Sequence, residues 1–130
     1  MTSLDGLWFY ESFCPAAGGA GKAPQIAAPW SPRGQLNVTT DLETGKITGT
    51  LQFGPKAILA ISGSITPATD NLPEGIELTG EGLSSISRLR GFFILGTNVF
   101  VVGTTVAIQN DPGKQPDGTS GPFVIFPSVG

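Results

Sequence analysis

The chain has 130 residues, a length at which a single domain can bury enough surface to hold a core without disulfides or metals. Its 19 glycines and 11 prolines follow no three-residue period, and 39% of its residues are hydrophobic, which excludes a collagen-like chain and a disordered one. Only 7 residues are lysine or arginine and the net charge is -3, so no nucleic-acid partner is expected. We expect one domain over residues 1–130, with frequent turns.

The chain has no histidine and a single cysteine, Cys14, which excludes a Cys/His zinc site and an intrachain disulfide. It also excludes Ser-His-Asp and Cys-His nucleophiles, so any enzyme would work without the commonest proton carrier. No apolar run approaches the roughly eighteen residues of a membrane-spanning helix, and the start lacks the features of a signal peptide. We expect no cofactor, no metal and no membrane, and a cytoplasmic location, with secretion after processing as the alternative.

The first predicted strand, Leu7 to Phe13, is dense in aromatic residues. From Cys14 to Gly34, prolines and glycines predict a long loop in which neither a helix nor a ladder strand persists. Loops of that length are often lids or partner-binding segments. Gln35 to Asp41 and Lys46 to Phe53 then alternate apolar and polar residues, which predicts a hairpin with Gly45 at positive φ in its turn.

Five further strands are predicted in the rest of the chain. They are Ala57 to Ile65, Gly75 to Leu83, Ile86 to Leu95, Val99 to Ile108, and Phe123 to Phe126 after the polar Gly/Pro loop Gln109 to Gly121. The first and fourth of these are apolar on both faces, which indicates strands covered on two sides. Strands joined in sequence by hairpins predict an all-β fold, an antiparallel up-and-down barrel of about eight strands, because closure removes the exposed edges.

A Gly-x-Trp motif, Gly6-Leu7-Trp8, opens the first strand. Three later segments, Gly45 to Thr50, Leu59 to Ser64 and Thr119 to Phe123, fall in the order in which avidin-like chains place similar strands. The chain thus resembles the calycin barrels of the avidin and lipocalin group, in which that Trp plugs one end. Leu78 to Gly82, followed by Arg90-Gly91, is also similar to the allene oxide cyclase and dirigent barrels. The resemblance implies an eight-stranded barrel with a central apolar pocket and, in several of these families, an oligomer.

The chain departs from the biotin site of that group. Leu89 stands where a sixth-strand Trp would be, and Gly121 stands where an Asp precedes the final Phe. Leu51 and Phe53 replace polar pocket positions on the third strand. The resemblance therefore implies a more apolar pocket, in which biotin is not expected.

Strand alternation places Trp8, Tyr10 and Ser12 on one face, so an inward Trp8 brings the two hydroxyls into the barrel as its best polar groups. A Tyr10 buried with a purely structural hydrogen bond is the alternative. Glu77 and Arg90 lie on neighbouring strands, where cross-strand ion pairing on the outside is expected. The candidate ligand-binding residues are Trp8, Tyr10, Ser12, Leu51, Phe53 and Leu89.

Three functions stay open. The first is a barrel that binds a small apolar molecule in its lumen. The second is a cofactor-independent isomerase or cyclase of the allene oxide cyclase or spiro-cyclase kind, in which pocket shape alone holds a reactive polyene near its attack geometry. The third is a protein-binding or self-assembling module, expected as a homo-oligomer because the charge is low and two strands are apolar on both faces. No catalytic residue can be named from the sequence.

Overall fold

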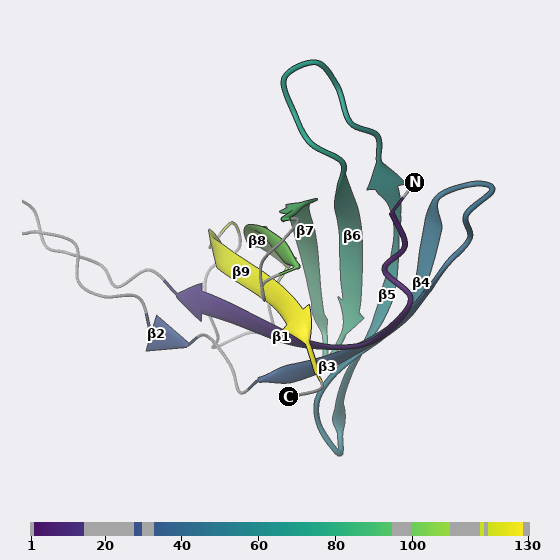
Figure 1. Cartoon of the computed structure of the whole chain (residues 1–130). Coiled ribbons are helices and arrows are strands. Elements are labelled where there is room, and N and C mark those ends of the chain that lie inside the picture. The colour runs from purple at the N-terminus through teal and green to yellow at the C-terminus, as the bar shows by residue number, and fades with distance from the viewer. Residues whose placement is uncertain are drawn as a thin grey trace, which may run out of the picture.

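The structure is a computed structural model that describes residues 2–14, 28–29, 33–94, 100–109, 118 and 120–128, with the backbone alone at 14, 28, 29 and 109. Eight strands form a closed antiparallel barrel, in which sequence neighbours pair and the last strand returns to the first (Figure 1). They are β1 (Gly6–Cys14), β3 (Gly34–Thr40), β4 (Lys46–Gly54), β5 (Ala57–Thr66), β6 (Gly75–Gly82), β7 (Ser85–Phe93), β8 (Val101–Gln109) and β9 (Ser120–Pro127). The predicted all-β, up-and-down barrel is confirmed, and its shape is consistent with a calycin-like barrel at a coarse level.

The predicted strands are all present, and two local predictions need correction. A two-residue strand, β2 (Ala28–Pro29), pairs with the end of β1 inside the segment where no ladder strand was expected. The closing strand begins at Ser120 rather than at Phe123, because Ser120 already pairs with Val106 of β8. Most other residues of the two long Gly/Pro loops lie outside the described residues. Within the described ranges, no helix is long and apolar enough to cross a membrane.

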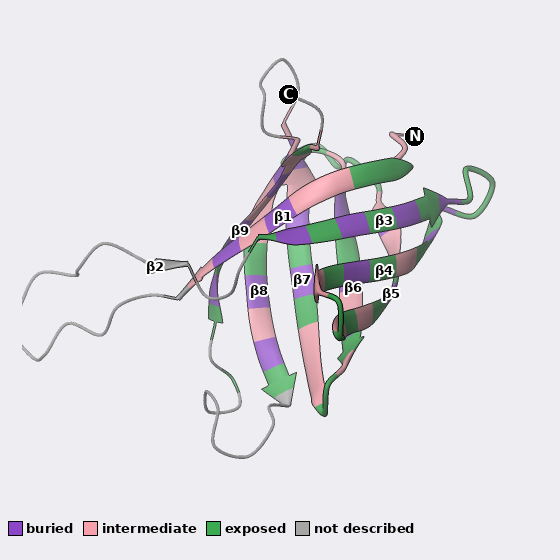
Figure 2. Ribbon diagram, turned by 90° about the horizontal axis from the view of Figure 1, so that it is seen from below, coloured by how far each residue is buried: buried purple, intermediate pink, exposed green. Residues whose placement is uncertain are grey.

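Alternation along the strands divides the barrel into an inner and an outer face. β3 shows this most plainly, since buried and exposed residues alternate along its whole length (Figure 2). Gly45, at φ 78°, makes the β3–β4 turn with the positive φ that was predicted. The inward side chains form one apolar core that contains Leu36, Ile47, Ile76 and Phe123, each no more than 1% exposed.

Glycines on the inner face allow the sheet to coil tightly enough to close. A Cβ on Gly63 would lie 2.0 Å from the carbonyl oxygen of Glu77, and one on Gly103 would lie 2.0 Å from that of Arg90. No side chain fits at such distances, so both positions require glycine. Close approach of neighbouring backbones at glycine is a common means of curving a sheet into a barrel.

The N-terminal segment closes one end of the barrel. Leu4 is fully buried there, its N–H donates to Oγ1 of Thr40 at 3.0 Å, and its carbonyl accepts from Nε1 of Trp8 at 3.0 Å. The Asp5 carboxylate accepts a hydrogen bond from the backbone N–H of Thr40. The Trp8 ring stacks on Phe100 with 4.7 Å between ring centroids. Trp8 and Leu4 therefore plug this end of the barrel.

We predict that Leu4→Ala lowers the free energy of unfolding by about 2–5 kcal/mol, because the plug loses a fully buried side chain that nothing else can replace. Leu7→Ala is the matched control, since Leu7 is three residues away but 49% exposed on the outer face, and it should change stability by less than about 0.5 kcal/mol. Urea denaturation followed by circular dichroism measures both. Equal effects of the two substitutions would contradict the role of the plug.

Candidate functional site

The end of the barrel opposite the Trp8 plug holds a cavity of about 160 Å³ that opens toward the rim. Six strands contribute to it near this end, and none of the described residues that line it is charged. The lining residues are Tyr10 and Ser12 of β1, Leu51 and Phe53 of β4, Leu59 of β5, Gly80 of β6, Ser87 and Leu89 of β7, and Thr105 and Ala107 of β8. β1 and β8 end at this rim, where the two long Gly/Pro segments leave the barrel.

The structure brings five of the six candidate ligand-binding residues to this cavity, namely Tyr10, Ser12, Leu51, Phe53 and Leu89. Trp8 is the exception, since it does not line the cavity. It shares the inner face of β1 with Tyr10, but the rise of the strand carries it to the closed end, where it packs on Phe100 and not on the cavity. A ligand-binding role for the other five stays a prediction.

Tyr10 is held firmly at the cavity wall. Its ring stacks on Phe123 at 5.6 Å between centroids and meets the edge of Phe53 at 6.0 Å. Burial raises the pKa of Tyr10 above its ordinary value of 10.0, and side-chain hydrogen bonds with Ser12 and Thr105 lower it in part. Tyr10 is thus a neutral phenol at physiological pH, and a hydrogen-bond donor in apolar surroundings.

Five lining residues were not identified from the sequence: Leu59, Gly80, Ser87, Thr105 and Ala107. Thr105 is the most important of them, because its hydroxyl reaches Tyr10. It lies next to Thr104 in a strand that is apolar on both faces, so alternation alone does not show which threonine points inward. Leu59 lies on the same face of its strand as Ile61 and Ile65, but the strand is apolar on both faces and nothing in the sequence showed that this face was the inner one.

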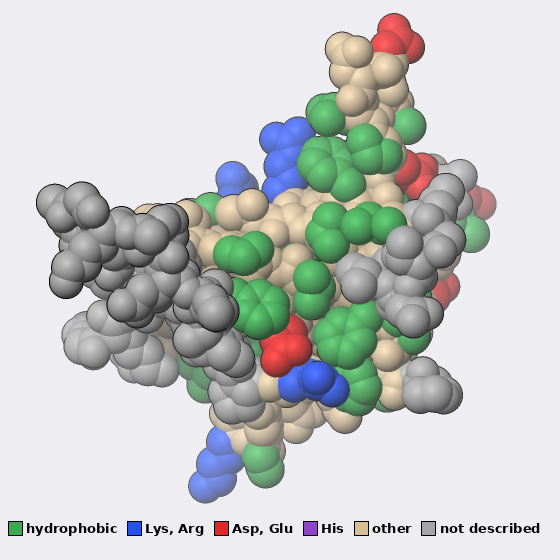
Figure 3. All heavy atoms as spheres, turned by 60° about the vertical axis from the view of Figure 1, so that its left-hand side comes forward, with side chains coloured by type: hydrophobic (Ala, Val, Ile, Leu, Met, Phe, Trp, Pro, Cys, Tyr) green, Lys and Arg blue, Asp and Glu red, His purple; other side chains and the backbone are tan. Residues whose placement is uncertain are grey.

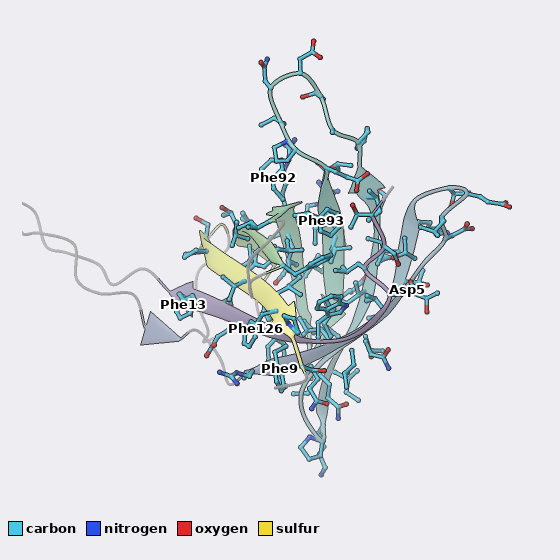
Figure 4. The ribbon with its side chains drawn as sticks, viewed as in Figure 1. Asp5, Phe9, Phe13, Phe92, Phe93 and Phe126 are labelled. Atoms are coloured by element: carbon cyan, nitrogen blue, oxygen red, sulfur yellow. The ribbon has the colours of Figure 1, made fainter. Side chains whose placement is uncertain are left out.

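The outer face of β1 and β9 carries an aromatic cluster. Phe9 and Phe126 lie opposite each other in the β1–β9 pairing, with 5.6 Å between ring centroids (Figure 4). The guanidinium of Arg33 lies 5.1 Å from the centroid of each ring and 3.7 Å from the Glu11 carboxylate. Figure 3 shows apolar side chains gathered on this side of the molecule, with charged groups among them.

Apolar residues continue from this cluster across the outer face. Val124 lies two residues before Phe126 on β9, and it pairs with Val102 of β8, which in turn pairs with Phe92 of β7. We call these residues, with Phe9, the outer stripe. β5 and β8 are the two strands that were predicted to be covered on both faces. In the described structure their outward residues are open to solvent, since Ile58 is 46% exposed and Ile108 is 45% exposed.

The predicted ion pair between Glu77 and Arg90 forms on the outer face, with 3.6 Å between Oε1 and Nε. Both side chains are more than half exposed, so the pair contributes little to stability. A hollow of about 560 Å³ lies around these side chains and Arg88, on the outside of β5 to β8. Its charged groups project into water, and we assign no site to it.

Among the described residues, no three His, Cys, Asp or Glu side chains gather where they could hold a metal ion. No protein-family model, curated protein or solved structure matches the chain. The cavity and the outer stripe therefore have to be interpreted from their own chemistry.

We predict that Tyr10, the single tyrosine of the chain, ionises in the folded protein only above pH 10.0. The unfolded chain releases this proton at lower pH than the folded chain, so the stability that Tyr10 contributes is complete below pH 10.0 and is lost as the pH rises through the folded pKa. Tyrosinate absorbance against pH, with and without denaturant, measures the shift. Tyr10→Phe should show a smaller loss of stability at alkaline pH, and identical titrations with and without denaturant would contradict the prediction.

Proposed function

We propose that the chain binds a small, predominantly apolar molecule in the cavity at the open end of the barrel. The observation that carries the proposal is the cavity itself, which combines an apolar lining with a group of hydroxyls around Tyr10. Apolar pockets with a few convergent polar groups are the usual form of small-molecule sites. We also propose the finer likeness to the avidin, lipocalin and allene oxide cyclase barrels. The Trp8 plug lies apart from the cavity, and this arrangement supports the likeness.

Size limits the ligand. At about 160 Å³ the cavity is close to the volume of about 150 Å³ that accommodates one benzene molecule in an engineered apolar cavity. A long polyene would extend far beyond the rim. A cofactor-independent isomerase or cyclase would use the same cavity, but its described lining offers no carboxylate, lysine or cysteine as a base. We therefore favour ligand binding over catalysis as the function of the cavity.

We predict that Ala107→Leu weakens the binding of toluene by more than about tenfold, because the longer side chain fills space that toluene would occupy. Ala60→Leu is the matched control, since Ala60 is exposed on the outer face of β5, and it should bind toluene as the unmodified chain does. Titration followed by nuclear magnetic resonance measures both affinities.

A second, milder variant covers the case in which Ala107→Leu fails to fold. A Cβ on Gly80 would meet only side-chain atoms, Cδ1 of Ile61 at 3.3 Å and Cδ1 of Leu59 at 3.5 Å, so Gly80→Ala narrows the cavity at small cost. It should weaken toluene binding less than Ala107→Leu does. The proposal fails if toluene does not bind the unmodified chain, or if neither variant weakens it.

We also propose that a second copy of this chain covers the outer stripe. The stripe presents aromatic and β-branched side chains across four neighbouring strands, β1, β9, β8 and β7, an arrangement typical of interfaces rather than of free surface. It carries one cation, Arg33, beside one anion, Glu11. Two copies related by a two-fold axis could therefore exchange these charges, so the face is complementary to itself.

Sedimentation should show that the chain associates and that Val102→Glu weakens the association at least tenfold, because an unpaired carboxylate would be buried at the centre of the stripe. Ser62→Glu is the control, since Ser62 is exposed mid-strand on the outer face of β5, away from the stripe. This variant should associate as the unmodified chain does. A chain that stays monomeric at high concentration, or a Val102→Glu variant that associates equally well, would overturn the proposed contact.

A further inference from the structure

The polar groups of the cavity are gathered at one part of its wall. Tyr10 and Ser12 come from β1, Thr105 from β8 and Ser87 from β7, so all four lie on the side of the barrel that runs from β7 through β9 to β1. β4 and β5 supply only apolar lining residues, Leu51, Phe53 and Leu59. A molecule in the cavity would therefore meet hydroxyls on one side and hydrocarbon on another, which gives it a preferred orientation.

Charge is the next restriction on the ligand. None of the described lining residues is ionisable at physiological pH, since Tyr10 is a neutral phenol. An ion that leaves water for such surroundings loses its hydration and gains no opposite charge, which is costly. The cavity therefore favours uncharged molecules over carboxylates or amines of the same size.

The hydroxyl group around Tyr10 also restricts which polar atom the ligand carries. A phenol has one O–H to donate, and its oxygen can accept further hydrogen bonds. The hydroxyls of Ser12 and Thr105 line the cavity together with that of Tyr10, so three O–H donors lie at this part of its wall. A ligand oxygen in the cavity can accept the Tyr10 O–H, and the ring contacts with Phe53 and Phe123 fix the position of Tyr10 at the cavity.

We infer that the ligand is an uncharged, single-ring-sized organic molecule with one hydrogen-bond acceptor, such as a ketone or aldehyde oxygen, which accepts the Tyr10 O–H. The ring or alkyl part lies against Leu51, Phe53 and Leu59. This inference rests on the proposed function, since it assumes that the cavity is the binding site.

Three probes of similar size test the inference: acetophenone, which carries a neutral acceptor; isopropylbenzene, which has a methyl group in place of the oxygen; and benzoate, which is charged. In the unmodified chain, acetophenone should bind more than tenfold more tightly than benzoate at neutral pH. In Tyr10→Phe, the ratio of acetophenone affinity to isopropylbenzene affinity should fall about threefold to tenfold, as expected for the loss of one hydrogen bond. The ratio removes any general effect of the substitution on the cavity.

Thr105→Val is a second variant, with nearly the same shape, for the case in which Tyr10→Phe is poorly folded. This substitution removes one hydroxyl from the polar part of the wall and keeps Tyr10 in place, so the same ratio should fall by a smaller factor. If both aromatic probes bind and neither substitution changes the ratio, the inference is wrong and the proposed function stands. Benzoate binding as tightly as acetophenone also overturns the inference. If no probe binds the unmodified chain, the proposed function itself fails.

Discussion

The pairing of the first strand with the last is the constraint on which the rest of the molecule depends. β1 and β9 run antiparallel from the Trp8–Pro127 pair to the Ser12–Phe123 pair, so residues more than a hundred positions apart form one seam. Without this seam the sheet would have two long open edges, which are sites of aggregation. With it, the inward residues of eight strands enclose a single core.

The seam also makes the two ends of the barrel unlike each other. The chain enters β1 through the segment that carries Leu4, and hydrogen bonds to Thr40 and Trp8 hold that segment across one end. No comparable described side chain seals the other end, where Tyr10 and Phe53 face the cavity. The same strand therefore plugs the barrel at its beginning and lines the cavity toward its end.

Much of this arrangement could be predicted from the residues. Alternation along the first strand placed Tyr10 on the same face as Trp8, and the resemblance to the calycin barrels implied that Leu51 and Phe53 are pocket positions, which line the cavity. The second strand of the hairpin has one face clearly more polar than the other, so its inner face could be recognised. In the first strand, the Gly6-Leu7-Trp8 motif indicated that Trp8 points inward, and Tyr10 shares its face. Alternation could not show that Trp8 lies away from the cavity, since a shared face does not imply a shared depth along the barrel.

The rest depended on information that the local sequence does not contain. β8 is apolar on both faces, and Thr105 points inward because it pairs with Gly121 and Leu89, a register that only the closed sheet determines. The local sequence did not indicate the conformation of the β6–β7 turn either. Leu83 and Ser84 adopt φ values of 54° and 59° there, a conformation usually taken by Asn and Gly. A tight hairpin formed by the surrounding strands evidently imposes this turn on residues that do not favour it.

The candidate site is built partly from core residues, and this limits which substitutions could change its ligand preference. Tyr10 is 3% exposed and packs on Phe123, itself among the most deeply buried side chains, while its hydroxyl faces the cavity. A charge introduced at this wall would need a buried partner, and the residues around Tyr10 supply aromatic rings and hydroxyls but no opposite charge. Changes of ligand preference are therefore expected to proceed through the size of residues such as Ala107 and Gly80, and through the number of hydroxyls, rather than through charge. The outer stripe is free of this constraint, because its side chains project away from the core, so association and ligand binding can change independently.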